Sequence, residues 1–334
     1  MIFSASGTKL GTKALLSALM ASLAVALLGV GGGGAPRAGA AVAADTPCGA
    51  GTAPPATWSH ITMIIFENKP LKKIIGNTQD APYINSIAAK CSYSARTDSL
   101  SLTSLANYIA LTSGHEGCDT ATSTGVCTHE KPITANKAPS VWPQASKSIF
   151  ELMQNNAVQW AEDSQGNCYT GGAGLFTVTH TPFPYYTRTP ALCQANARPF
   201  PTDKTQVLSA KFNLVIPNKK NIMHLVPDTT VSDRIRNGDS WLKGYLPTLL
   251  NSPTYQAGTS VILITWDEGN AKNYTVPLIV LSPSTTVGGV STVPYDHYST
   301  LKGVQEMLGQ TTLLGHAGDV GKSSIRNDAL FNLR

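Results

Sequence analysis

Two pairs of acidic and amide side chains directly follow two of the most apolar stretches of the sequence. Glu67-Asn68 comes after the run 61–66, and Asp267-Glu268 comes after the run 261–266. Short, continuous apolar runs are typical of strands that are buried on both faces of a parallel sheet. Ligands of open α/β sheets bind beyond the carboxyl ends of the strands, so we expect both pairs to lie at one edge.

Carboxylates that converge at such an edge repel one another unless a cation or a proton lies between them. A set of oxygen ligands suits a hard divalent cation such as Mg²⁺, Ca²⁺ or Mn²⁺, and the sequence leaves the identity of the ion open. The alternative is that each acid only caps the helix that follows it. Taken together, the two pairs favour a site for one divalent metal ion, held by Glu67, Asn68, Asp267 and Glu268.

A pair of hydroxyl residues, Thr103-Ser104, opens a segment that is predicted to be helical over 104–112, with Gly114 as its stop. The N-terminus of a helix offers unpaired N–H groups and a positive dipole end, which suit a phosphate group. A neighbouring metal ion would lower the pKa of the hydroxyl and make it a nucleophile. The alternative is that Thr103 or Ser104 is only the N-cap of the helix.

Three of the seven histidines are candidates for a role in the chemistry. His224 comes after the strand predicted at 213–216, His297 opens the last helix, and His180 lies in a segment rich in proline and aromatic residues. Cleavage of a phosphate ester needs a group that stabilises or protonates the leaving oxygen, and histidine suits this task. Taken singly, each of them would be interpreted as a surface or packing residue.

The N-terminal part of the chain has the pattern of an export signal. A basic start precedes an apolar run over 14–30, and a small-residue segment ends at Ala43-Ala44. This pattern predicts a signal peptide over residues 1–44 that is cleaved near Ala43 or Ala44. The alternative is an N-terminal membrane anchor, since the run is about the minimum length for a span. We therefore expect a secreted protein with no stable membrane span after cleavage.

The charge of the mature chain does not indicate a nucleic-acid partner. The formal charge of +5 falls to about +2 when the leader leaves with Lys9, Lys13 and Arg37. Binding to nucleic acid would need a clustered basic patch, whereas Lys219-Lys220 is the densest basic pair near the expected site. We expect no nucleic-acid partner, and the oligomeric state stays open.

The six cysteines all lie in the mature part of the chain, and an even number in an exported protein predicts three disulfides. Fifteen pairings are possible, so the sequence alone does not fix the connectivity. Sequence neighbours suggest Cys118–Cys127 and Cys168–Cys193, which leaves Cys48–Cys91.

Apolar strands alternate with helices along the mature chain, which predicts an α/β fold with a mainly parallel central sheet and helices on both faces. The predicted strands are 61–66, 92–98, 157–161, 213–216, 261–266 and 276–281. The predicted helices are 83–90, 104–112, 146–156, 297–308 and 232–251, the last broken near Pro247. We expect a flexible tether over 45–57 and a single domain over 58–334.

Two segments without clear periodicity interrupt this alternation. Residues 115–142 are rich in Thr, Ser, Gly and Pro and are predicted to be a loop pinned by Cys118 and Cys127. Residues 164–206 are rich in Gly, Pro and aromatic residues and are predicted to be a long surface excursion. Both would shape substrate specificity.

Several motifs resemble those of the bacterial phosphoesterase family, which holds secreted acid phosphatases and phosphatidylcholine-type phospholipases C and belongs to the alkaline phosphatase superfamily. The resemblance covers roughly residues 58–310, and the compact spacing is more similar to that of the short acid phosphatases. The motifs, in family order, are Phe66-Glu67-Asn68, Ile74-Ile75-Gly76-Asn77, Ala81-Pro82-Tyr83-Ile84-Asn85-Ser86, Ser104-Leu105-Ala106-Asn107-Tyr108, His180-x-Pro182-Phe183, Pro217-Asn218 with Met223-His224, Gly238-Asp239-x-Trp241-Leu242, Thr265-Trp266-Asp267-Glu268 and His297-Tyr298-Ser299.

The resemblance implies an alkaline-phosphatase-like fold and a role for each matching residue. It makes Ser104 the nucleophile of a secreted acid phosphatase that hydrolyses phosphomonoesters through a phosphoserine. The substrate would be a small-molecule or lipid phosphate ester. The implied metal ligands are Glu67, Asn68, Asp267 and Glu268; the implied histidines around the phosphate are His180, His224 and His297; and the implied substrate-binding residues are Asn107 and Asp239.

The sequence departs from the family pattern at three places. Leu102-Thr103 replaces a His-Pro pair, and Ala106 replaces a common proline. The family has an acid on each side of its Met-His pair, and Ile222 and Leu225 stand at these positions here. Thr103 therefore competes with Ser104 as the nucleophile, and a second metal ion is not expected. Two alternatives stay open: a phospholipase C that acts on phospholipid phosphodiesters, and a catalytically reduced secreted binding protein.

Overall fold

The computed structural model describes residues 46–49, 53–224, 226–327 and 329–331. The predicted signal peptide over residues 1–44, with its cleavage site, lies outside the described residues, as does part of the predicted tether over 45–57. Among the described residues, no helix combines the length and the apolar composition that crossing a bilayer requires.

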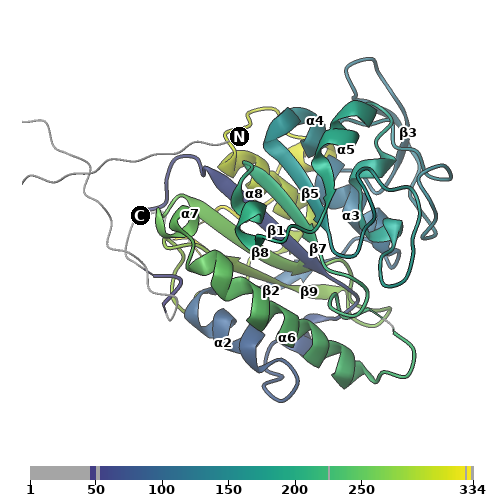
Figure 1. Ribbon diagram of the computed structural model, residues 1–334. Coiled ribbons are helices and arrows are strands. Elements are labelled where there is room, and N and C mark those ends of the chain that lie inside the picture. Colours follow the sequence, from purple (N-terminus) through teal and green to yellow (C-terminus); the bar gives the residue numbers. More distant parts are fainter. Residues whose placement is uncertain (1–45, 50–52, 225, 328, 332–334) are drawn as a thin grey trace, which may run out of the picture. The chain divides into compact units, whose positions relative to one another are not determined.

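Nine strands form one sheet in the order β10-β2-β9-β8-β1-β7-β5-β6, with β11 paired to β2. Of these strands, β9 runs antiparallel to both of its neighbours, and the other pairings are parallel. The prediction of a mainly parallel α/β sheet is confirmed (Figure 1). The strands are β1 His60–Phe66, β2 Ser92–Asp98, β5 Ala157–Ala161, β6 Ala197–Pro199, β7 Phe212–Ile216, β8 Ser260–Trp266, β9 Thr275–Leu281, β10 Val290–Ser291 and β11 Tyr295–Asp296.

The side chains of β1 alternate between two hydrophobic cores, one on each face of the sheet. Ile61, Met63 and Ile65 belong to the core that α3, α4, α5 and α8 cover, and Ile64 and Phe66 belong to the core beneath α1, α2, α6 and α7. Figure 1 shows α2 and α6 on one face and α3, α4 and α8 on the other. The helices are α1 Leu71–Ile74, α2 Pro82–Lys90, α3 Ser104–Ser113, α4 Ile149–Met153, α5 Pro190–Asn196, α6 Val231–Leu250, α7 Pro253–Gln256 and α8 His297–Met307.

Two predicted helices differ from the observed ones. α6 is continuous through Pro247 and begins with a capping box between Thr230 and Asp233, so the predicted break is wrong. Pro247 lies in the last turn, where a single lost N–H bond does not end the helix. α4 is shorter than the predicted 146–156, because Ser148 caps its start and Gln154, at φ 51°, ends it.

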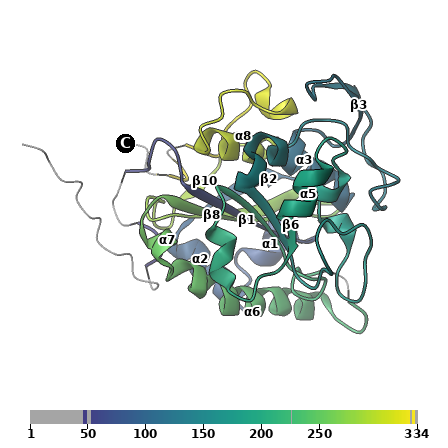
Figure 2. The same cartoon turned by 45° about the horizontal axis from the view of Figure 1, so that its top comes forward.

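Both irregular segments contain regular structure that the sequence did not indicate. Residues 115–142 include the two-stranded hairpin of β3 Cys118–Ala121 and β4 Cys127–Glu130, which lies at the periphery beyond α3 (Figures 1 and 2). Residues 164–206 include α5 and the edge strand β6, which extends the sheet beyond β5.

Three disulfides join the six cysteines in the suggested pairing. They are Cys48–Cys91, Cys118–Cys127 and Cys168–Cys193. The first ties the start of the described chain to the end of α2, the second closes the hairpin, and the third holds α5 to the segment after β5. The predicted disulfides are confirmed.

The Gly238-Asp239 motif in α6 joins this helix to its neighbours. Both carboxylate oxygens of Asp239 accept hydrogen bonds from the start of α2, at 3.2 Å from the Tyr83 N–H and 2.8 Å from the Ile84 N–H. A Cβ atom on Gly238 would lie 2.5 Å from the side chain of Met223, so only glycine leaves room for the Met223 side chain. The geometry thus gives Asp239 the role of a helix cap, which differs from the substrate-binding role that the resemblance implies.

Replacement of Asp239 separates these two roles. As a cap, Asp239→Asn should lower the melting temperature by a few degrees, since hydrogen bonds to a charged group contribute about 1.5–3 kcal/mol, and it should leave KM unchanged. Thermal unfolding and KM measured on one preparation check this. A raised KM at an unchanged melting temperature would restore the substrate-binding role.

Candidate active site

The carboxyl ends of β1 and β8 bring the two predicted acid pairs together. The strands pair in register up to Phe66 and Trp266, and the ladder continues when the Asp267 N–H donates to the Phe66 carbonyl oxygen at 2.9 Å. The Asn68 N–H then donates to Asp267 Oδ1, also at 2.9 Å. Glu67, Asp267 and Glu268 are buried, and Asn68 is exposed at φ 43°.

Glu67 receives two side chains from α3. The Ser104 hydroxyl donates to Glu67 Oε2 at 3.2 Å, and the Tyr108 hydroxyl donates to Glu67 Oε1 at 2.9 Å. Residues four apart lie on the same face of a helix, which is why Ser104 and Tyr108 reach one carboxylate. We did not predict Tyr108 as a site residue, although its spacing from Ser104 was a signal that could have found it.

The loop before α3 is held by Asn107. Its Oδ1 accepts from the N–H groups of Leu100 and Ser101, and its Nδ2 donates to the carbonyl oxygens of Ser101 and Thr103. These bonds occupy the amide that the resemblance assigns to substrate, so the geometry makes Asn107 a positioning residue for the start of α3. Thr103 is the N-cap, but its side chain makes no capping bond.

Asn136, which lies in the 115–142 segment, contacts the start of α3. Asn136 Oδ1 accepts from the Leu105 N–H at 3.0 Å, at the helix N-terminus where a phosphate oxygen would bind. Asn136 itself is exposed. The sequence contained no pattern that connected this residue with Ser104.

Two of the three predicted histidines converge on Glu67. His180 Nε2 lies 3.3 Å from Glu67 Oε1, and its ring stacks on Tyr108 at a centroid distance of 5.8 Å. The ring of His224 lies 5.1 Å from that of His180. One ligand atom each of Glu67, His180 and His224 lie within 4.8 Å of one another, so these three side chains also form a possible metal-binding group.

The third histidine, His297, opens α8 and contacts the other acid pair. Its Nε2 lies 2.5 Å from the Asp267 carbonyl oxygen. A carbonyl oxygen only accepts, so Nε2 carries the proton and Nδ1 has a lone pair. Among the described residues, this buried Nδ1 has no hydrogen-bond partner. Burial lowers the pKa of His297, which favours the neutral ring.

The buried carboxylates fit a divalent cation. Burial and then the neighbouring Asp267 raise the pKa of Glu67 well above its usual range. Burial raises the pKa of Asp267 to about 6, and burial together with Asp267 raises that of Glu268 to about 8. Asp267 Oδ2 and Glu268 Oε2 are buried without a hydrogen-bond partner among the described residues. Orphaned acceptors with this preference for a positive charge are what a bound cation would satisfy.

A lysine that we did not predict lies beside these acids. Lys69 is buried and donates to the Met223 carbonyl oxygen at 2.9 Å and to the Asn68 carbonyl oxygen at 3.3 Å. Burial and then Arg234 lower its pKa to about 8, and Glu67 and Asp267 oppose that shift. Its bonds join the loop after β1 to the loop that carries His224. Its position two residues after Glu67 was the signal in the sequence.

The acids at the end of β5 have a structural task. Glu162 accepts from the Asn218 N–H and from Nδ2 of Asn221, and Asp163 accepts from Nδ2 of Asn218. These bonds fix the loop that follows β7 and leads to His224. The acids after β1 and β8 therefore belong to the candidate site, whereas the acids after β5 support one of its loops.

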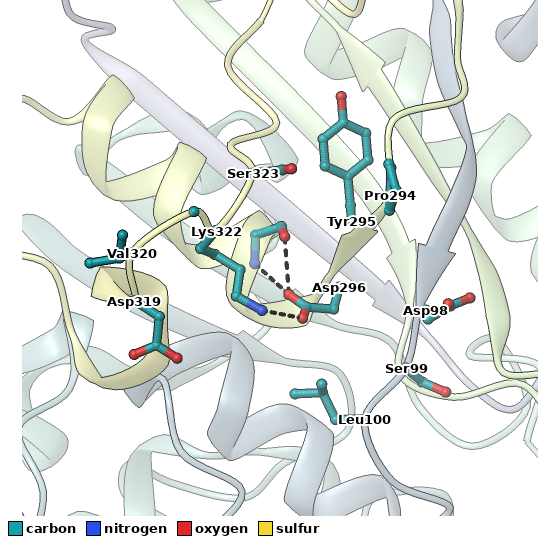
Figure 3. A pocket seen from close by; sticks show the side chains of 12 residues that line it. Asp98, Ser99, Leu100, Pro294, Tyr295, Asp296, Asp319, Val320, Lys322 and Ser323 are labelled. Atoms are coloured by element: carbon teal, nitrogen blue, oxygen red, sulfur yellow. Dashed lines mark hydrogen bonds and ion pairs between the residues drawn. The ribbon is translucent and has the colours of Figure 1, made fainter.

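A cavity of about 670 Å³ lies beside the candidate site (Figure 3). Its wall includes Ser99 and Leu100 from the loop before Ser104 and Asp296, which precedes His297. The Lys322 ammonium group donates to Asp296 Oδ2 at 2.6 Å, as Figure 3 shows. The cavity thus adjoins the segments that carry Ser104 and His297, without being lined by those two residues.

Comparisons with known proteins agree with this arrangement. A family model described as the phosphoesterase family matches residues 76–309, which is more than half of the chain. A phosphatidylinositol-3-phosphatase of Mycobacterium tuberculosis is 25% identical over 295 residues, and the match covers 87% of each chain. The range matched by the family model begins after Glu67 and Asn68, so that model does not bear on these two residues.

Two solved structures share the fold. A protein of the alkaline phosphatase superfamily from Vibrio parahaemolyticus has a TM-score of 0.53 at 10% identity, with 82% of this chain and 72% of that chain covered. A lipoteichoic acid synthase from Listeria monocytogenes has a TM-score of 0.51 at 12% identity, with 79% and 75% covered. These likenesses establish an alkaline-phosphatase-superfamily fold. The family match shows that the chain belongs to the phosphoesterase family and, with the relative from Mycobacterium tuberculosis, that it is a hydrolase that acts on phosphoric ester bonds.

Proposed function

We propose that the protein is a secreted, metal-dependent phosphatase that hydrolyses phosphomonoesters through Ser104. The observation that carries this proposal is the contact between the buried Ser104 hydroxyl, at the start of α3, and Glu67, at the edge where Asp267 and Glu268 present oxygens without partners. A buried hydroxyl, a helix N-terminus and carboxylate oxygens without partners lie next to one another, which supports the proposed roles of a nucleophile beside a cation site.

The residues that would hold the metal ion are Glu67, Asn68, Asp267 and Glu268. Glu67 belongs to both possible ligand groups, because His180 and His224 also surround it. A bound divalent ion would supply positive charge that lowers the pKa of the serine hydroxyl and stabilises phosphate oxygens. The raised pKa values of the carboxyl groups mean that protons and metal ion compete for this site.

In the proposed reaction, Ser104 Oγ forms a bond to phosphorus as the bond to the ester oxygen breaks, which gives a phosphoserine and an alkoxide. The alkoxide leaves as the alcohol with the proton that the Ser104 hydroxyl gave up. Water then attacks phosphorus as the bond to Oγ breaks; one proton of the water returns to Oγ, and phosphate leaves. The start of α3, held by Asn107, positions Oγ, since positioning and charge stabilisation dominate phosphoryl transfer.

The histidines would handle the proton and the phosphate oxygens. Burial, and then the neighbouring His224 and Lys219, lower the pKa of His180 well below its usual range, so its ring is neutral. A neutral ring can relay a proton between Ser104 and the leaving oxygen. Because the charge of Lys219 contributes to the lowered pKa of His180, we expect Lys219 to supply positive charge near the position where a phosphate dianion would bind.

The relative from Mycobacterium tuberculosis favours a monoester substrate. It is named for removal of a phosphate from a phosphoinositide, so a lipid phosphomonoester is a candidate substrate beside small phosphomonoesters. The alternative, a phospholipase C, would use the same groups on a phosphodiester.

The three disulfides support secretion, because disulfides persist in oxidising compartments. We propose that residues 1–44 are the signal peptide, 45–57 a tether and 58–334 the catalytic domain.

Replacement of the hydroxyl residues identifies the nucleophile. Ser104→Ala should lower kcat by at least about a thousand-fold, because the phosphoserine cannot form. Thr103→Ala is the matched control, one residue away at the N-cap, and should retain activity. Phosphate release from an aryl phosphomonoester measures both. Full activity of Ser104→Ala, or loss of activity in Thr103→Ala alone, would contradict the assignment.

Removal of metal separates the enzyme from a binding protein with the same fold. A chelator should abolish phosphate release from an aryl phosphomonoester, and added divalent ions should restore it. Phosphatidylcholine assayed in parallel should release far less product if the monoester preference is right. Hydrolysis of phosphatidylcholine alone would favour the phospholipase C, and metal-dependent stabilisation without any hydrolysis would favour the binding protein.

The pH dependence of stability tests the metal ligands without an activity assay. The pKa of Glu268 is raised from 4.5 to about 8 in the folded chain, so the folded state binds this proton more tightly than the unfolded state, and metal-free protein loses stability as the pH rises from about 4.5 to about 8. Metal-free Glu268→Gln, which has no charge to bury, should therefore melt a few degrees above the wild type at pH 9. This difference should disappear near pH 5.

The same variant should lose most of the rise in melting temperature that added metal gives the wild type. Glu162→Gln is the control, since Glu162 is a strand-end acid that binds loop amides outside the site; it should keep the metal-induced rise. An equal metal-induced rise in Glu268→Gln and the wild type would exclude Glu268 as a ligand.

A further inference from the structure

Three side chains from distant parts of the sequence converge away from Glu67. His115 follows the C-cap of α3, Glu130 ends β4 of the hairpin, and His316 lies in the short 3₁₀ helix Gly315–Gly318. His115 Nδ1 lies 2.6 Å and His316 Nε2 lies 2.9 Å from the same oxygen, Glu130 Oε1. One ligand atom of each residue lies within 4.8 Å of the other two. We name this group the His115–Glu130–His316 cluster.

Two glycines hold the histidines in this position. The His316 N–H donates to the Gly114 carbonyl oxygen at 2.9 Å, which joins the 3₁₀ helix to the end of α3. Gly114 and Gly315 both have positive φ, at 77° and 45°. A Cβ atom on Gly114 would lie 2.3 Å from the Leu314 carbonyl oxygen, and one on Gly315 would lie 2.4 Å from the Gly114 carbonyl oxygen. Only glycine permits this close approach of the two backbones. Because His115 and His316 directly follow these glycines, the approach brings the two histidines together.

A carboxylate also orients the far side of His316. His316 Nδ1 lies 2.9 Å from Asp319 Oδ2. Both ring nitrogens therefore face carboxylate oxygens, and each bond needs a proton on nitrogen. Burial lowers the pKa of His316, but the bonds to Asp319 and Glu130 outweigh it and raise the pKa above the usual value. A metal ion in place of the proton on Nε2 would leave the bond from Nδ1 to Asp319 intact, and this carboxylate–histidine–metal arrangement is common in zinc sites.

We propose that the His115–Glu130–His316 cluster is a second metal site, of the class that binds Zn²⁺. His115 Nδ1, His316 Nε2 and a Glu130 carboxylate oxygen would be the protein ligands, and Asp319 would orient His316. Two imidazoles and one carboxylate form a known zinc donor set, with a fourth position left for water. Hard cations that prefer oxygen ligands would not favour this site, because imidazole suits Zn²⁺ better than Mg²⁺ or Ca²⁺.

The surroundings of the cluster suit an exchangeable cation. The side chain of Glu130 is 46% exposed and that of His115 is 11% exposed, so one ligand can adjust while another is fixed. A cavity of about 630 Å³, lined by His115, Gly315 and Cys127 of the hairpin, gives an ion and water access.

A metal ion here would cross-link three elements that covalent bonds leave apart. It would join the end of α3, whose other end carries Ser104, to the disulfide-closed hairpin and to the C-terminal segment. Asp319, the residue that orients His316, also lines the cavity shown in Figure 3. Occupancy of the site would therefore order one wall of that cavity.

Metal stoichiometry tests the proposal without an activity assay. Chelator-stripped protein is dialysed against Zn²⁺, and bound metal is counted by mass spectrometry. The double variant Asp267→Asn/Glu268→Gln should retain one equivalent of zinc, because its lesion is confined to the active site. Adding His316→Ala to that variant should remove this equivalent. Zinc bound by the active-site variant and by the triple variant in equal amounts would overturn the proposal.

Co²⁺ provides a spectroscopic readout of the site, and circular dichroism checks that each variant is folded. In the Asp267→Asn/Glu268→Gln background, Co²⁺ should give the visible absorption of a four-coordinate site, and Glu130→Gln should abolish it while the circular dichroism spectrum is unchanged. His129→Ala is the matched control, because His129 is an exposed histidine of the same hairpin that pairs with Asp119 at 2.7 Å; it should keep the Co²⁺ spectrum. A Co²⁺ spectrum unaffected by Glu130→Gln would exclude the cluster as the binding site.

Asp319 has a separate test as a positioning residue. Asp319→Asn should weaken zinc binding by about 10–100-fold without removing the site, as expected for loss of a carboxylate behind a ligating histidine. Calorimetric titration with Zn²⁺ measures the change. Unchanged affinity would show that Asp319 does not orient His316 for a metal ion.

Discussion

The buried carboxylate of Glu67 is the contact on which the rest of the candidate site depends. It receives Ser104 and Tyr108 from α3 and lies against His180, while its own backbone continues β1. A carboxylate without access to water must find partners, because an unpaired buried charge costs several kcal/mol. The need to satisfy this one group therefore brings a strand, a helix and a long loop into a common geometry.

Hydrogen bonds from polar side chains hold the backbones of the loops around Glu67. Asn107 fixes the approach to α3, and Glu162 and Asp163 fix the loop that carries His224. Lys69 spans the loops after β1 and β7 through two carbonyl oxygens. Catalytic groups that develop charge work best on a framework that does not reorganise, and here hydrogen bonds to the main chain supply that framework.

The sequence predicted the fold and the convergence of acids because both follow from local rules. Continuous apolar runs indicated β1 and β8, and a parallel sheet aligns their carboxyl ends. Edge strand β6 was missed because its three residues have no period, and the predicted break of α6 at Pro247 was wrong because packing and the capping box outweigh one lost hydrogen bond. The cap formed by Asp239 was also missed, since sequence motifs do not distinguish a carboxylate that binds backbone from one that binds substrate.

Strand order has a consequence for when the protein can function. β1 lies between β7 and β8, so both of its neighbours come from far later in the chain. Until residues 260–266 are available, β1 lacks one partner and Glu67 lacks its companion carboxylates. Such long-range pairing makes folding slow, because much of the chain must be ordered before the contacts form. A chain that emerges from its N-terminus therefore cannot bring Glu67 together with Asp267 and Glu268 until most of it has emerged, so this edge of the sheet is assembled late in synthesis.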